Sequence, residues 1–173
     1  MSHEKPLSEL VKPDWISAPD WQATLEKVGS LERIRADARA HVATYLATNG
    51  EDGYHQELAP LPCLLITTIG HQSGKQAITA LNFLLLDRKY YVVGSLAGIG
   101  TDPVWARNLK HTPQAWVQVK DQRWEAEVHQ LDDAERAVIW PTLVKTMPLW
   151  EVFQQRTDRP FPVFALSPKA NQG

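Results

Sequence analysis

The sequence of 173 residues has little of what marks several large classes of protein. Its one cysteine, Cys63, excludes an internal disulfide and any cysteine-rich zinc or iron–sulfur site. Its apolar stretches, such as residues 64–66 and 83–86, are far shorter than a membrane-spanning helix. The first twenty residues contain no apolar run of the signal-peptide kind. We therefore expect a soluble, cytoplasmic protein without a transmembrane segment.

An excess of charge of one sign is also missing. The chain has 18 basic and 20 acidic residues, a formal net charge of −2, so its balance does not indicate binding to nucleic acid. Its six histidines form no His-x-x-x-His pair and no cluster with carboxylates, so no metal site is expected. There is no Gly-x-Ser-x-Gly sequence, which excludes the nucleophile elbow of serine hydrolases.

What the chain does have is the composition of one globular domain, with 43% hydrophobic residues and seven tryptophans. We expect two parts, an N-terminal arm with a helix over residues 1–60, either packed on the barrel or loosely attached to it, and a barrel domain over residues 61–173. In the first part, Asp20 is the expected N-cap of one helix. Ser30 is the expected N-cap of a second helix, which ends at Asn49.

After residue 60 the hydrophobic period changes to that of β-strands. The expected strands cover residues 63–69, 76–86, 90–95, 115–120, 123–131 and 162–166. Most of them are joined by tight turns, which predicts antiparallel hairpins. Helices are expected between and around the strands. The sequence therefore predicts an α+β fold built on an antiparallel sheet or a small barrel.

Helix signals in the second half of the chain are local and specific. Asp102 followed by Pro103 predicts an N-cap and a short helix to about residue 110. Asp132 with Glu135 matches a capping box. Two further helices are expected after it, over residues 134–147 and 149–155.

Two glycine-containing segments are candidates for ligand binding. Residues 70–75, Gly-His-Gln-Ser-Gly-Lys, do not form a P-loop, because only three residues separate the glycines and Gln76 follows the lysine. They fit either an ordinary hairpin turn or a turn that holds an anion. Residues 94–98, Gly-Ser-Leu-Ala-Gly, fit either an ordinary loop or one whose small residues let the backbone approach a flat ligand.

Taken together, these segments resemble a known family. The shared pieces are Leu-Ile-Thr-Thr-Ile-Gly-x-x-Ser-Gly-Lys, Val-Val-Gly-Ser-x-x-Gly, Asp-Pro-Val-Trp-Ala-Arg-Asn-Leu-Lys-His-Thr-Pro and Arg-Thr-Asp-Arg-Pro-Phe-Pro-Val. They resemble the deazaflavin-dependent nitroreductase and quinone reductase family over residues 64–168. The resemblance implies a split β-barrel, similar to oxidoreductases that bind flavin mononucleotide (FMN). It also implies coenzyme F420 as the cofactor, with FMN as the alternative, and hydride transfer to a quinone, a nitro compound or an activated alkene.

The same resemblance implies where the ligands bind. Ser95 would lie beside the coenzyme ring and hydrogen-bond a substrate oxygen as negative charge develops, which makes it the catalytic candidate. The candidates for coenzyme binding are His71, Gln72, Ser73, Gly74, Lys75, Ser95, Leu96, Ala97, Gly98, Pro103, Trp105 and Asn108. The candidates for lining the acceptor site are Asn82, Met147, Trp150 and Phe153.

The chain departs from the family pattern at basic positions. The family turn usually carries Gly-Arg-Lys-Ser/Thr-Gly and a later arginine, whereas this chain has His71, Gln72 and Ala77 there. The usual Lys-Gly-Gly after the serine is Leu-Ala-Gly at residues 96–98. Fewer cations would weaken the binding of the phosphate and carboxylates on the coenzyme tail. The nearby cations that could compensate are Lys75, Arg107, Lys110 and His111.

Three readings therefore stay open from the sequence. The first is a reductase that uses a deazaflavin or a flavin and a small hydrophobic acceptor. The second is a non-catalytic barrel that holds a fatty acid, another lipid or a tetrapyrrole in the same groove, because Met147, Trp150 and Phe153 replace the tyrosines of the nitroreductases. The third is a protein that keeps the fold alone. A homodimer is an additional expectation for any of them.

Overall fold

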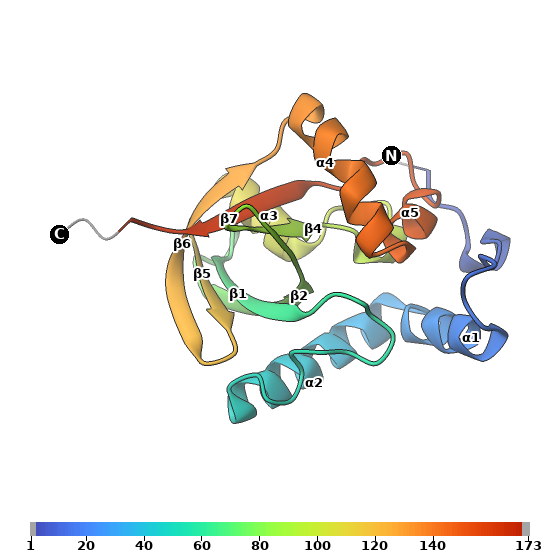
Figure 1. Cartoon of the computed structure of the whole chain (residues 1–173), viewed down its shortest axis with the longest axis horizontal. Coiled ribbons are helices and arrows are strands. Elements are labelled where there is room, and N and C mark those ends of the chain that lie inside the picture. Colours follow the sequence, from blue (N-terminus) through green and yellow to red (C-terminus); the bar gives the residue numbers. More distant parts are fainter. Residues whose placement is uncertain (1–2, 171–173) are drawn as a thin grey trace.

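A computed structural model describes residues 3–170 and contains one curled antiparallel sheet with helices around it (Figure 1). The strands are β1 (Cys63–Ile69), β2 (Gln76–Asn82), β3 (Leu84–Leu86), β4 (Lys89–Val93), β5 (Ala115–Val119), β6 (Gln122–Gln130) and β7 (Val163–Pro168). Their order across the sheet is β2-β1-β5-β6-β7-β4-β3, and every pair is antiparallel. The predicted α+β split β-barrel is therefore confirmed.

The sheet curls round because its two edge strands are neighbours in the chain. β2 and β3 lie at opposite ends of the strand order, yet only Phe83 separates them. Phe83 is buried, and its N–H donates to the carbonyl of Pro62 at 2.9 Å. The chain thus changes partner at this residue, from β1 to β4. The prediction of one continuous strand over residues 76–86 was wrong, because this change of partner breaks it.

β1 is buried on both of its faces. Leu64 and Ile66 belong to the core inside the barrel, whereas Cys63 and Leu65 pack beneath Tyr45 of a covering helix. A strand covered on both faces has no need for alternating polar residues, which explains its nearly continuous apolar sequence.

Helices cover the barrel on its outside. They are α1 (Ala18–Lys27), α2 (Leu31–Thr48), α3 (Val104–His111), α4 (Asp133–Thr146) and α5 (Leu149–Gln154), with short 3-10 turns η1 (Leu7–Glu9) and η2 (Leu96–Gly98). Figure 1 shows α1 and α2 on one side of the barrel and α4 and α5 on another. In the part of the chain that the structure describes, no helix combines the length and the apolar character that crossing a membrane requires.

Three of the expected helix ends are set by residues within one turn of the helix. Ser30 accepts from the N–H of Arg33 at 3.1 Å and caps α2, which ends where Asn49 turns left-handed with φ 49°. Asp132 and Glu135 form the reciprocal capping box of α4. These three predictions are confirmed.

Two predicted caps were wrong. α1 begins at Ala18 and Ser17 is its N-cap, since the Ser17 hydroxyl accepts from the N–H of Asp20 at 3.2 Å. Pro103 stands at the N-cap position of α3. Asp102 does not cap α3, and its carboxylate forms ion pairs with Arg159 and Lys110.

Tyr45 fastens α2 to the barrel. Its hydroxyl donates to the carbonyl of Cys63 at 3.0 Å and accepts from the N–H of Lys120 at 2.9 Å, and its side chain is fully buried. The N-terminal segment is therefore packed on the barrel. The division into residues 1–60 and 61–173 stays a prediction, and the outermost residues of those two ranges, 1–2 and 171–173, lie outside the described residues.

Candidate functional site

A cavity of about 310 Å³ lies where helix α2 meets the edge strand β2 and the loop after β4. Helix α2 supplies one wall, and β2 with the end of β4 supplies another. The loop at residues 95–103 and the first turn of α3 complete it. The lining residues are Leu31, Ile34, Arg35, Ala38, Thr79, Ala80, Leu81, Val93, Ser95, Leu96, Ile99, Thr101, Asp102, Pro103, Val104, Trp105 and Arg107.

The chemistry of this lining is that of a small-molecule site. Most of the wall is apolar, and three residues that carry hydroxyl groups, Thr79, Ser95 and Thr101, also line it. Two guanidinium groups, Arg35 of α2 and Arg107 of α3, also line it. Such a cavity can hold a flat ring and meet an anionic substituent at its rim.

The loop after β4 has an unusual backbone. Ser95 is in the right-handed helical region, and the next three residues are left-handed, with φ of 43° at Leu96, 51° at Ala97 and 75° at Gly98. A Cβ atom on Gly98 would lie 2.2 Å from the carbonyl oxygen of Phe153, so only glycine fits there. Leu96 and Ala97 each hold a conformation that costs a non-glycine residue about 1–2 kcal/mol.

Arg159 stabilises this loop from the far end of the chain. Its buried guanidinium donates to the carbonyls of Gly94 and Ser95, each at 2.9 Å, and to that of Ile99 at 2.8 and 3.0 Å. It also pairs with Asp102 at 2.8 Å. Burial lowers the pKa of Arg159, the Asp102 carboxylate opposes that shift, and the group stays protonated at neutral pH.

Arg156 adds a second anchor to the same loop, because its Nη1 donates to the carbonyl of Ala97. Sequence reasoning missed the roles of Arg156 and Arg159. The Arg-Thr-Asp-Arg-Pro-Phe-Pro-Val segment was a signal for them, but nothing local to it shows which loop the two side chains reach.

Asn108 is fully buried behind the cavity and joins α3 to the turn after β1. Its Oδ1 accepts from the backbone N–H of His71 at 3.0 Å and from the His71 ring Nδ1 at 2.8 Å, and its Nδ2 donates to the Thr68 hydroxyl at 3.0 Å. Every polar atom of this amide is thus used within the fold. Asn108 therefore fixes the turn after β1 to α3.

The turn at residues 70–75 does not line the cavity. Its Gly70 N–H donates to the carbonyl of Lys75 at 2.8 Å, and the Ser73 hydroxyl accepts from the N–H of Lys75 at 3.1 Å. Gln72, Ser73, Gly74 and Lys75 are exposed. The structure thus brings Ser95, Leu96, Pro103 and Trp105 together on the cavity, while the candidates of the turn stand apart and are tied to α3 by Asn108.

The predicted acceptor residues divide into two groups. Asn82, Met147 and Phe153 line a separate cavity of about 150 Å³ that α1 and the loop before β1 help to enclose. Trp150 does not line it and is buried in the core between the barrel, α4 and α5.

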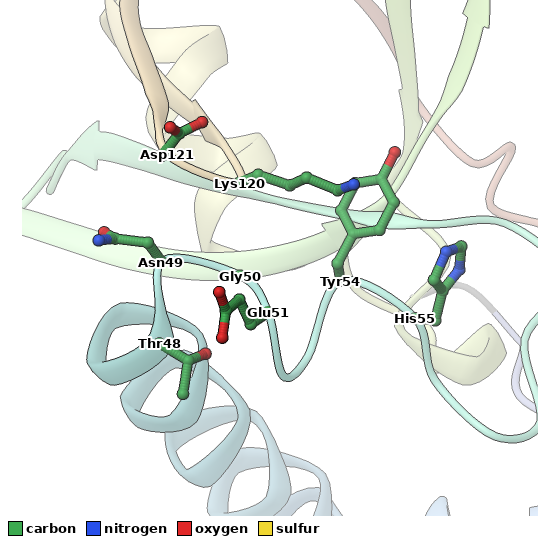
Figure 2. Close-up of a pocket in the computed structure, with 8 residues that line it drawn as sticks. All are labelled: Thr48, Asn49, Gly50, Glu51, Tyr54, His55, Lys120 and Asp121. Atoms are coloured by element: carbon green, nitrogen blue, oxygen red, sulfur yellow. The ribbon is translucent and has the colours of Figure 1, made fainter.

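A third cavity, of about 530 Å³, lies between the end of α2, the following loop and the turn between β5 and β6. Figure 2 shows Lys120 reaching over the Tyr54 ring, with its Nζ 4.7 Å from the ring centroid, and Asn49 and Glu51 on the opposite wall. Its lining within the described chain includes none of the predicted site residues. Size alone therefore does not identify the site, and the cavity between α2 and the loop after β4 is the stronger candidate.

Comparison with known proteins gives one consistent result. The model of a family described as F420H(2)-dependent quinone reductase matches residues 37–168. An F420H(2)-dependent quinone reductase of Mycobacterium tuberculosis is 32% identical over 132 residues, which cover 75% of this chain and 88% of the relative. A second protein of that species, named a putative F420H(2)-dependent quinone reductase, is 30% identical over 110 residues, which cover 64% of this chain and 92% of the relative.

Solved structures agree with the sequence matches. A structure named as an F420-H2 dependent reductase is similar with a TM-score of 0.55 and 33% identity, covering 61% of this chain and 94% of that one. Another, described as a domain-swapped dimer, has a TM-score of 0.58 and 31% identity, covering 75% of this chain and 96% of that one. The matched family region starts inside α2 and contains every predicted site residue, but it leaves out Leu31, Ile34 and Arg35.

Proposed function

The chain belongs to the F420H(2)-dependent quinone reductase family, and from this premise we propose that it transfers a hydride from reduced coenzyme F420 to a small hydrophobic quinone. Coenzyme F420 is the cofactor of this family. The observation that carries the proposal is the cavity between α2 and the loop after β4, which gathers Ser95 and Trp105 at one site.

The residues around this cavity fit the coenzyme in kind. About 310 Å³ of mainly apolar space is at the lower end of small-molecule sites, enough for a flat ring system but too little for a long charged tail as well. Arg35 and Arg107 would then meet the phosphate and carboxylates of the tail at the rim. Lys110 is a poorer candidate, because it is paired with Asp102.

When bound, reduced coenzyme F420 supplies a hydride, which no side chain of the protein can donate. We assign the remaining tasks to the chain itself. Leu31, Ile34 and Ile99 would exclude water from the ring, and the loop held by Arg159 would fix its orientation. The Ser95 hydroxyl would donate a hydrogen bond to the acceptor oxygen as negative charge develops there.

We place the apolar part of the acceptor near Asn82, Met147 and Phe153. These side chains line a small cavity whose wall is mostly apolar, and Asn82 uses its amide within the fold by donating to the carbonyl of Leu61 at 2.8 Å. A mostly apolar wall favours a hydrophobic acceptor over a polar one.

The test is a binding titration followed by a kinetic assay. Tryptophan fluorescence would be followed while oxidised coenzyme F420, FMN or a long-chain fatty acid is added, since Trp105 lines the cavity. Saturable binding of coenzyme F420 alone supports the proposal. Binding of the fatty acid without coenzyme F420 would instead favour the non-catalytic lipid-binding function, and binding of FMN alone would replace the coenzyme.

The kinetic assay would mix the protein with reduced coenzyme F420 and a short-chain quinone and follow the absorbance of the oxidised coenzyme. Ser95→Ala should lower kcat/KM by about 10- to 100-fold while leaving the Kd of the coenzyme within about twofold. Ser167→Ala on β7, outside the cavity, is the matched control and should behave as wild type. No quinone reduction by wild-type protein that binds the coenzyme would refute the proposed acceptor.

We also propose that the chain forms a homodimer in solution. One similar solved structure is described as a domain-swapped dimer. Sedimentation equilibrium decides the point, because a 19.5 kDa chain and its dimer differ twofold in mass.

A further inference from the structure

The first residues that the structure describes run beside the segment between α5 and β7. Glu4 and Thr157 form an isolated antiparallel bridge, and the N–H of Lys5 donates to the carbonyl of Arg156 at 2.7 Å. The Arg156 Nε returns a bond to the carbonyl of Lys5 at 3.0 Å. Figure 1 shows the first described part of the chain, in dark blue, close to α5. The N-terminal arm is thus fixed to Arg156 by its backbone.

The side chain of Glu4 continues from this bridge to the loop of the candidate site. Its Oε1 accepts from Arg156 Nη2 at 3.0 Å, and its Oε2 accepts from the backbone N–H of Gly100 at 3.0 Å. Arg156 donates in turn to the carbonyl of Ala97. One carboxylate therefore connects to both ends of residues 97–100.

The ion pair between Glu4 and Arg156 is buried on the side of the arginine. The Arg156 side chain is 6% exposed and that of Glu4 39%. Burial lowers the pKa of Arg156, while the charge of Glu4 opposes this shift. Without Glu4 a buried guanidinium would lose its carboxylate partner, which costs more than the loss of an exposed pair.

The loop needs such external contacts because its own backbone is strained. Leu96 and Ala97 are left-handed residues with side chains, so the local preference of the chain opposes the observed conformation. Arg159 holds the carbonyls of Gly94, Ser95 and Ile99. The carbonyl of Ala97 accepts from Arg156, and the N–H of Gly100 donates to Glu4.

We propose that Glu4 is a positioning residue for the coenzyme, because through Arg156 and the N–H of Gly100 it keeps residues 95–101 in the conformation that forms the cavity wall. This inference rests on the proposed function, since it takes coenzyme F420 as the ligand. Glu4 lies ahead of residue 37, where the match to the family model begins, so the family resemblance does not contain it. Leu96, Ile99 and Thr101, which line the cavity, are the residues it would place.

The test compares Glu4→Ala and Glu4→Gln with wild type and with Glu9→Ala, which removes an exposed carboxylate from the same arm. The first measurement is amide hydrogen exchange of residues 95–101 in protein without coenzyme. Glu4→Ala should speed this exchange by about tenfold, Glu4→Gln should lie between it and wild type, and Glu9→Ala should match wild type. Equal exchange in all four proteins would overturn the inference.

The second measurement is the Kd of oxidised coenzyme F420 and the kcat at saturating coenzyme. If the binding conformation becomes rarer, the apparent Kd should rise by about 5- to 20-fold in Glu4→Ala, while kcat stays within about twofold. An unchanged Kd, or a loss of kcat at unchanged Kd, would contradict a positioning role. If wild type itself does not bind the coenzyme, the proposed function fails, whereas hydrogen exchange still decides whether Glu4 orders the loop.

Discussion

Arg35 and Arg107 differ from the other arginines near the candidate site in having no carboxylate partner among residues 3–170. Arg156 is buried, Arg159 is half-buried, and the guanidinium groups of both are used by the fold. Arg35 and Arg107 are exposed at the rim of the cavity, so their full charge is available to a ligand. They come from two different helices, α2 and α3.

A first prediction follows from these two charges. Arg35→Gln and Arg107→Gln should each raise the Kd of coenzyme F420 by about 5- to 20-fold, because a charge-assisted hydrogen bond contributes about 1–2 kcal/mol. Fluorescence titration would measure this. The affinity for a deazaflavin ring without the phosphate and carboxylate tail should not change. Arg33→Gln, three residues after the N-cap Ser30 and absent from the cavity lining, is the control.

If both variants bind the tail-less ring more weakly as well, the arginines shape the cavity and do not recognise the tail. If neither variant changes any Kd, the tail is bound elsewhere, and the exposed turn at residues 70–75 with Lys75 becomes the alternative place.

Among the elements, the short turn η2 has the least support from its own sequence. Three consecutive left-handed residues suit glycine, yet two of them are Leu96 and Ala97. Contacts from Arg156 and Arg159 hold the turn in place of local preference. The conformation is therefore a property of the folded chain and not of the segment alone.

Substitutions at neighbouring positions of η2 should change the free energy of unfolding by very different amounts. Gly98→Ala should lower the free energy of unfolding by at least about 2 kcal/mol, because its methyl group would meet the Phe153 carbonyl at 2.2 Å. Ala97→Gly should change it by less than about 1 kcal/mol, since relief of the left-handed strain offsets the greater flexibility of glycine in the unfolded chain. Urea unfolding of both variants measures the difference. Equal losses would show that φ at these positions does not govern stability.

Elements whose limits depend on neighbouring residues could be predicted from the sequence. Ser30 and the pair of Asp132 and Glu135 act within one helical turn, so their type and spacing suffice. The residue type and position of Asp102 also predicted an N-cap. Its carboxylate instead accepts a hydrogen bond from Arg159, which is 57 residues away in the sequence. A rule that considers only neighbouring residues cannot include such a partner.

The candidate site could be predicted only in part. Ser95 was predicted from a sequence motif, whereas Arg35 belongs to a helix that carries no motif.

For the whole molecule, the closure of the barrel could not be predicted from neighbouring residues in the sequence either. Phe83 sits in an apolar run that predicts one strand, and nothing in that run shows that its two halves pair with β1 and β4. The antiparallel barrel itself was predictable because tight turns join most of its strands. The wall supplied by α2 was not, since only tertiary packing brings Leu31 and Ile34 to the cavity.

The burial of several weak acids makes the stability of the whole fold depend on alkaline pH. Burial raises the pKa of Cys63 from 9.0 to about 12, and it raises the pKa of Tyr45 and of Tyr54 above 10.0. Since these groups keep their protons longer in the folded state, their contribution is complete below the unfolded pKa values. It is lost as the pH rises through the folded ones.

We therefore expect the free energy of unfolding to be flat with respect to these groups up to about pH 8 and to fall from about pH 9 upward. Each group adds a slope of at most about 1.4 kcal/mol per pH unit. Urea unfolding at pH 7, 9, 10 and 10.5 measures the fall, and Cys63→Ala should reduce its first part. A curve for Cys63→Ala that runs parallel to wild type from pH 7 to 10.5 would show that this thiol does not contribute.

The burial of Cys63 also has a practical consequence for labelling chemistry. With a pKa of about 12, only about one thiol in 10,000 is ionised at pH 8, and the side chain is 1% exposed. The native cysteine can therefore stay in place when a maleimide dye is attached to the protein. A single new cysteine at the exposed Thr101 would be the one reactive thiol of the folded chain, and a fluorophore there would stand at the rim of the cavity.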